Sequence, residues 1–249
     1  MKAYIKNNFK YLLFLLFFGL VGGYFTARYS LEMVPQDAID EAVAQVGSIE
    51  MVILITTIQC LLYALGAGIV GKILAEKIGL WRKTTFEAKP VYSTIIVSVL
   101  AGVGIILPDI FIFGRFSDAI KESYNAKPSA DFIFASLTYG GVVEEILMRL
   151  FLMSLIAFIL CKITHKAEPS ETQLVVANVI VAILFAAGHL PATAISIGLS
   201  PMIIFRCFLL NGGAGLLFGR LYRKYGIHYA MLTHAGAHIV SKLIWILFI

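Results

Sequence analysis

The strongest constraint on this chain is a series of apolar runs, each about as long as a membrane is thick. An α-helix rises 1.5 Å per residue, so about 20 apolar residues cross a hydrocarbon core about 30 Å thick. Apolar residues make up 59% of the 249 residues, and they gather in long runs rather than in the short periodic stripes of soluble helices. The runs cover residues 10–29, 51–75, 91–113, 131–162, 172–190, 200–222 and 227–248.

These runs predict an all-α fold, a polytopic bundle of about seven transmembrane helices. Strands of a transmembrane barrel would be about ten residues long and would alternate apolar and polar side chains. An eighth helix, or a re-entrant piece near Leu107, Pro108 and Asp109, would move the C-terminus to the other side of the membrane. No polar stretch between the runs is long enough to fold alone, so we expect residues 1–249 to form a single membrane domain.

The first run follows Lys2, Lys6 and Lys10, a pattern that also occurs in cleaved signal peptides. No convincing small-residue cleavage site follows it, and the apolar stretch continues through Gly23 to Phe25. We therefore expect an uncleaved first helix.

The distribution of basic residues predicts the orientation, because Lys and Arg are enriched in cytoplasmic loops. With the N-terminus in the cytoplasm, seven spans put the C-terminus outside and place the basic residues mostly inside. The inside set is Lys2, Lys6, Lys10, Lys72, Lys77, Arg82, Lys83, Lys89, Lys162, Lys166, Arg220, Arg223 and Lys224. The outside set is Arg28, Arg115, Lys121 and Lys127. The net charge of +5 is thus a topology signal in what we expect to be the cell membrane, and it predicts no nucleic-acid partner.

Two other patterns carry little functional weight. Residues 66–72 read GAGIVGK, which resembles a nucleotide-binding loop. Such a loop needs a preceding strand and a following helix N-terminus, whereas this one lies late in an apolar run, so we predict no nucleotide partner. The three cysteines, Cys60, Cys161 and Cys207, lie in or at the end of apolar runs and are predicted to pack as small apolar residues.

Ionisable residues inside the fourth run are the first functional signal. Ionisable groups at bilayer depth cost about 2.5–3.5 kcal/mol each, so they usually face a cavity or a partner. Glu145 and Arg149 are four residues apart on one helical face and can pair. Glu144 is rotated about 100° away and has no such partner, which suits a general acid or base. The alternative is that both glutamates only lock helices together through salt bridges.

Three histidines lie in later runs. His189 follows Phe185 near the end of the fifth run, and His234 and His238 share one face of the seventh. A histidine pair of this spacing can bind a metal, line a cavity or form hydrogen bonds between helices. Arg206 and Lys242 are weaker candidates, because their long side chains can reach a membrane interface.

In order along the chain stand EExxxR at 144–149, FxxxH at 185–189 and an HxxxN-like element at 234–238. Together with the text GLLFGRLY at 215–222, this set resembles the CAAX protease and bacteriocin-processing family (CPBP, or Abi), and in particular type II CAAX prenyl proteases. The resemblance covers roughly residues 130–240, where we expect the catalytic core. One position departs from the family, which usually has Asn or Asp where this chain has His238.

The resemblance implies an intramembrane endopeptidase with a peptide or protein substrate delivered by the bilayer. It implies that Glu144 and His189 activate water, that His234 and His238 polarise the carbonyl or stabilise its oxyanion, and that Glu145 and Arg149 position them. It implies no obligatory cofactor, with zinc on His189, His234 and His238 as the alternative. A prenylated C-terminus, a leader peptide, a bacteriocin and a signalling peptide all remain open as substrates. Two other classes also remain: a transporter or channel that uses these charges as a proton relay, and a non-catalytic immunity or scaffold protein.

Overall fold

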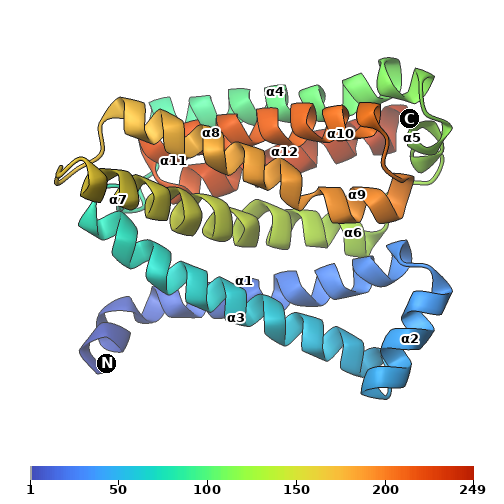
Figure 1. Ribbon diagram of the computed structural model, residues 1–249, viewed down its shortest axis with the longest axis horizontal. Coiled ribbons are helices and arrows are strands. Elements are labelled where there is room, and N and C mark those ends of the chain that lie inside the picture. Colours follow the sequence, from blue (N-terminus) through green and yellow to red (C-terminus); the bar gives the residue numbers. More distant parts are fainter. Residues whose placement is uncertain (1) are drawn as a thin grey trace.

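The computed structural model describes residues 2–249, and every regular element in that range is helical. Seven helices, or series of helices joined end to end, are long and apolar enough to cross a membrane (Figure 1). The all-α, polytopic fold predicted from the apolar runs is therefore confirmed, and the chain is an integral membrane protein.

The spans are built from both single helices and joined series. They are α1 (Lys2–Met33); α3 (Ile49–Lys77); α4 (Ala88–Phe111) with η1 (Phe113–Arg115); α6 (Ala130–Ala135), η2 (Ser136–Glu144), η3 (Ile146–Met153) and α7 (Ser154–Ile163); α8 (Glu171–Gly188) with α9 (Leu190–Ile197); α10 (Pro201–Cys207), η4 (Phe208–Gly212) and α11 (Gly213–Tyr225); and α12 (Ile227–Phe248). Two short helices, α2 (Gln36–Val46) and α5 (Asp118–Ser123), lie outside the spans.

Local sequence explains where several helices begin. Ser48 accepts a hydrogen bond from the backbone N–H of Met51 and caps α3. At α8 the Ser170 hydroxyl and the Gln173 side chain form a reciprocal capping box, which satisfies two donors that the first turn leaves free.

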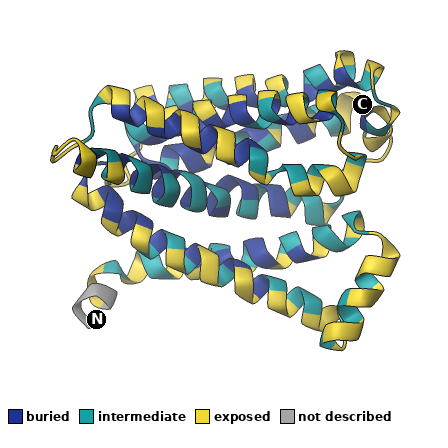
Figure 2. Cartoon of the chain, in the orientation of Figure 1, coloured by how far each residue is buried: buried dark blue, intermediate teal, exposed yellow. Residues whose placement is uncertain are grey.

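The outward faces of the spans are apolar, and buried residues line the faces where spans meet (Figure 2). Leu62, Leu100 and Phe205 are each about 60% exposed, which suits contact with lipid chains. α1 and α3 pack against one another, and α1 also packs against η2. Glycines allow these contacts: a Cβ atom at Gly71 would lie 2.8 Å from the Leu150 backbone of η3.

The region around Leu107, Pro108 and Asp109 gives no eighth span within residues 2–249, because α4 continues through Pro108 to Phe111. Asp109 is buried and bonded to Arg206, with 2.5 Å between its Oδ1 and Arg206 Nε. Tyr124 donates a hydrogen bond to Asp109 Oδ2 at 2.8 Å, and burial followed by the Asp109 charge raises the pKa of Tyr124, so the phenol stays protonated.

Arg206 and Lys242, which the sequence analysis left as side chains that can reach a membrane interface, both contact other spans. Arg206 is committed to Asp109. Lys242 is only 6% exposed, and its Nζ atom lies 4.1 Å from the centre of the Phe132 ring. Both cations thus join spans together inside the bundle.

The three cysteines are buried and free, as predicted from their apolar surroundings.

Candidate active site

The fourth span is not a regular α-helix where it carries its charges. From Ser136 to Met153 it is π-helical, apart from a single intervening residue, Glu145. Stretches of π-helix are rare, and they occur frequently at functional sites. The ideal turn of 3.6 residues expected through Glu144 and Glu145 is therefore wrong, because the backbone there is π-helical. The two carboxylates still point in different directions.

Glu145 lies in a fully buried network of charges. Its Oε1 atom accepts hydrogen bonds from Arg149 Nη1 at 2.7 Å and from His234 Nδ1 at 2.8 Å. Both Glu145 and Arg149 are 0% exposed, and His234 is 4% exposed. The i, i+4 pair predicted from the sequence is therefore present, and it has a third member from α12.

Backbone and aromatic groups complete the surroundings of Arg149. Its Nη2 atom donates to the Gly215 carbonyl at 3.0 Å, and a Cβ atom at Gly215 would lie only 3.1 Å from that nitrogen. The guanidinium carbon lies 4.6 Å from the centre of the Phe185 ring and 5.5 Å from that of Phe218. The phenylalanine of FxxxH and two residues of GLLFGRLY thus surround one buried cation.

His189 occupies the break between α8 and α9. Its Nδ1 atom lies 2.8 Å from the Phe185 carbonyl, an acceptor, so the proton of the neutral ring is on Nδ1 and the lone pair is on Nε2. The fifth span continues beyond His189 to Ile197, whereas the sequence predicted its end at residue 190. His189 therefore lies inside this apolar span rather than at its end.

His238 lies one turn beyond His234 on α12, and the two rings stack with 4.9 Å between their centres. A Cβ atom at Gly140 would lie 3.0 Å from His238 Nε2 and 4.0 Å from Glu144 Oε2. The absence of a side chain at Gly140 therefore leaves open the space beside both groups.

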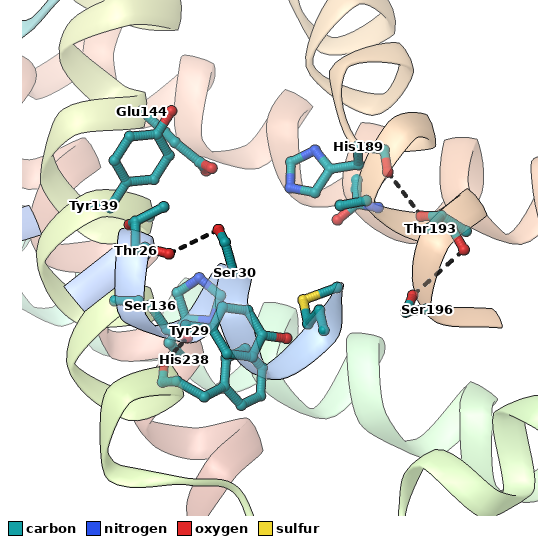
Figure 3. Close-up of a pocket in the computed structure, with 16 residues that line it drawn as sticks. Thr26, Tyr29, Ser30, Ser136, Tyr139, Glu144, His189, Thr193, Ser196 and His238 are labelled. Carbon is teal, nitrogen blue, oxygen red and sulfur yellow. Dashed lines mark hydrogen bonds between the residues drawn. The ribbon is translucent and has the colours of Figure 1, made fainter. Parts of the chain in front are cut away.

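Glu144, His189 and His238 line one cavity of about 400 Å³, and they come from three different spans. Figure 3 shows the Glu144 carboxylate and the His189 ring directed towards one another across it. Among residues 2–249, Glu144 has no hydrogen-bond or ion-pair partner, in contrast to Glu145. The structure thus brings an uncommitted carboxylate and two imidazoles together at membrane depth.

Residues 127–240 match the family described as Type II CAAX prenyl endopeptidase, Rce1-like. This segment is Rce1-like. It holds the six residues singled out from the sequence, and the match confirms the resemblance drawn from their motifs. The match over this segment supports a peptidase. No curated protein and no solved structure matches the chain.

His234 does not line the cavity of the Rce1-like segment, although the sequence placed it beside His238 in the reaction. It lies behind His238, stacked on Phe218 with 4.4 Å between the ring centres and bonded to Glu145. Within residues 2–249, no three His, Cys, Asp or Glu side chains are placed to hold a metal ion. The arrangement of His189, His234 and His238 therefore does not fit a zinc site.

Several cavity residues were not predicted from the sequence. Asn211, in the π-helical turn η4, lines the cavity, and its Nδ2 atom donates to Cys207 Sγ at 3.4 Å. It could have been noticed as a lone amide in an apolar run. Thr26 and Tyr29 of α1 also line the cavity, but they lie outside the Rce1-like segment and in no motif.

Proposed function

We propose that this protein hydrolyses a peptide bond within the membrane, in the cavity lined by Glu144, His189 and His238. The observation that carries the proposal is their convergence: three separate spans bring a carboxylate without a partner and two imidazoles to one cavity. The Rce1-like match over residues 127–240 supports the same reaction class independently of this geometry.

In the proposed reaction, Glu144 removes a proton from a water molecule, and the water oxygen attacks the peptide carbonyl carbon. The His189 Nε2 lone pair accepts the second hydrogen bond of that water and orients it, because Nδ1–H is already committed to Phe185. When the C–N bond breaks, Glu144 returns its proton to the leaving nitrogen. The products are a new carboxylate and a new amine.

The tetrahedral intermediate carries negative charge on the former carbonyl oxygen, and preorganised donors would stabilise it. His238 can donate an N–H to this oxyanion, and the Asn211 amide is a second donor on the same cavity wall. In the family the usual residue at the position of His238 is Asn or Asp, so His238 would replace one donor with another.

The buried network would act by positioning. Arg149 neutralises Glu145, Glu145 holds the His234 ring, and His234 stacks against His238. Because Arg149, Glu145 and His234 are each held by more than one contact, the ring against which His238 stacks would be fixed before substrate enters.

The substrate we propose is a peptide or protein segment within or beside the bilayer, as the name of the Rce1-like family suggests. We also propose that the N-terminus is cytoplasmic and that the protein resides in the cell membrane, which the basic loops support.

The test is to reconstitute the purified protein in lipid nanodiscs and incubate it with membrane-associated peptides. The parent should generate two fragments detectable by mass spectrometry, and Glu144→Gln should generate none. The same proteins in sealed liposomes should show equal, background proton flux. Proton flux that depends on Glu144, without fragments, would favour a proton-coupled transporter or channel instead.

A further inference from the structure

A second cavity, of about 580 Å³, lies beside the proposed catalytic cavity; we call it the vestibule. Its walls come from the end of α1, the segment from α5 to α6, α9, Arg206 of α10 and Trp245 of α12. These parts meet at the end of the bundle that carries α2, α5 and the C-terminus (Figure 1).

The vestibule and the catalytic cavity share part of their walls. Both are lined by Tyr29, Met33, Phe132, Thr193 and Ser196. Two cavities with five common lining residues open into one another or are separated only by those side chains. At most these side chains therefore lie between the cavity that holds Glu144 and the vestibule.

The opposite half of the bundle is closely packed. Leu150, Met153, Ala157 and Tyr222 are all at most 1% exposed and belong to one hydrophobic cluster, and Tyr222 is hydrogen-bonded to Ser154 at 2.7 Å. The cavities described at that end include a basic one lined by Lys10, Lys72 and Arg82 among others, and none of their residues lines the catalytic cavity.

Charge distinguishes the two ends. The closed end carries the basic loops, including Lys77, Arg82, Lys83 and Lys166, whereas the acidic helix α2 lies at the vestibule end. With the basic loops in the cytoplasm, as we propose from their charge, the vestibule is on the extracytoplasmic side.

The vestibule has three charged lining residues, and of these Arg206 is held in an ion pair. Arg206 is bonded to Asp109, and the Glu32 carboxylate accepts the Ser129 hydroxyl at 2.7 Å. Lys127 donates to the last carbonyls of α12, with 3.0 Å to Ile246 O. Glu32 and Lys127 are exposed and opposite in charge, so the wall carries no net charge, and the rest of it is made of aromatic rings, methyl groups and hydroxyls.

We infer that the substrate enters from the extracytoplasmic face through the vestibule, and that it is an extended, uncharged segment rich in apolar and hydroxyl side chains. This inference rests on the proposed function. It disfavours a prenylated tail presented by a cytoplasmic protein, and it favours an exported peptide or the extracytoplasmic part of a membrane protein.

The experiment uses the full chain with one cysteine added at the shared wall, Ser196→Cys, in intact cells. The parent is the baseline, because Cys60, Cys161 and Cys207 are buried. Two comparisons accompany it: Asp40→Cys on exposed α2, at the same end but away from the vestibule, and Thr84→Cys in the loop at the closed end. Cells are treated with a membrane-impermeant maleimide, and each protein is then purified and assayed for peptide hydrolysis with and without labelling.

We expect Ser196→Cys and Asp40→Cys to be labelled and Thr84→Cys to be protected. Labelling should remove most of the hydrolysis of Ser196→Cys and leave that of Asp40→Cys at its unlabelled rate. Labelling of Ser196→Cys only in inside-out vesicles, or full hydrolysis after it is labelled, would overturn the inference. Absence of hydrolysis in all unlabelled proteins would instead refute the proposed function, while the labelling pattern would still report the side on which the route opens.

The charge preference is tested on the parent with two peptides that differ only in four residues on one side of the cleaved bond. In the uncharged peptide these residues are Ser and Val, and in the charged peptide they are Lys and Asp. The uncharged peptide should be cleaved faster, chiefly through a lower KM. Equal KM values would overturn the specificity part of the inference.

Discussion

Glu144 and Glu145 are adjacent in the chain, yet their carboxylates lie in opposite surroundings. Glu145 is buried and accepts hydrogen bonds from Arg149 and His234. Glu144 lines a cavity and has no partner among residues 2–249. The spacing to Arg149 was sufficient to predict which glutamate is paired. The participation of His234 in that pair could not be predicted, because it depends on how α12 packs against the fourth span.

The two glutamates should therefore respond differently to the same substitution. We expect Glu144→Gln to abolish hydrolysis and leave the thermal midpoint unchanged, since it removes a base and keeps the shape. Glu145→Gln should lower stability, because it leaves Arg149 as a buried, unpaired charge, a loss of about 3–5 kcal/mol. Thermal unfolding of the purified variants measures both. If Glu145→Gln and Arg149→Leu were both silent, the buried network would have no structural role.

The departure of His238 from the family pattern leads to a second prediction. An oxyanion donor can be replaced by another N–H donor, so His238→Asn should keep substantial activity and His238→Ala should lose about 10²–10³-fold in kcat. Activity and bound metal are measured together on both variants. A dead Asn variant that has also lost bound zinc would contradict the donor role and would indicate a metal ligand instead.

At the scale of elements, glycine allows α3 to pack closely against the fourth span, which carries Glu144. A Cβ atom added at Gly71 of α3 would lie 2.8 Å from the Leu150 backbone, whereas one added at Gly66 of the same helix would have nothing within 4 Å. The sequence predicted that both lie in one apolar helix. It could not distinguish them, because the difference lies in the neighbouring span.

Gly71→Ala should lower the thermal midpoint and reduce hydrolysis, because backbone cannot move aside for the added methyl group. Gly66→Ala is the matched control and should equal or exceed the parent in stability, since Ala is favoured over Gly in helices by about 1 kcal/mol. Thermal unfolding of both proteins decides the matter, and equal midpoints would refute the close α3–η3 contact.

The helical spans were predictable from apolar length, but the irregular parts of those spans were not. The π-helical turns around Glu144 and Asn211 and the break at His189 interrupt otherwise normal apolar runs. No residue type signals a π-turn by itself. These irregularities nevertheless set where the cavity lies, so the sequence located its motif residues and missed Asn211, Thr26 and Tyr29.

At the scale of the whole molecule, the basic loops gather at one end and the cavities of the proposed site at the other. This arrangement predicts that cysteine placed at residue 40 is labelled by an impermeant reagent in intact cells, and that cysteine placed at residue 84 is not. The reverse labelling pattern would invert the orientation of every loop. The segment that carries the family resemblance covers residues 127–240, and the wall supplied by α1 became visible only in the folded bundle.

The central claim is that Glu144 directs water to a peptide carbonyl inside this bundle. The most direct test is cleavage of a membrane peptide by the purified protein in water enriched in ¹⁸O, with mass spectrometry of the fragments. We predict one ¹⁸O atom in the new carboxylate of the N-terminal fragment for the parent, and no fragments for Glu144→Gln. Fragments of the same yield from Glu144→Gln, or new termini without ¹⁸O, would contradict the account.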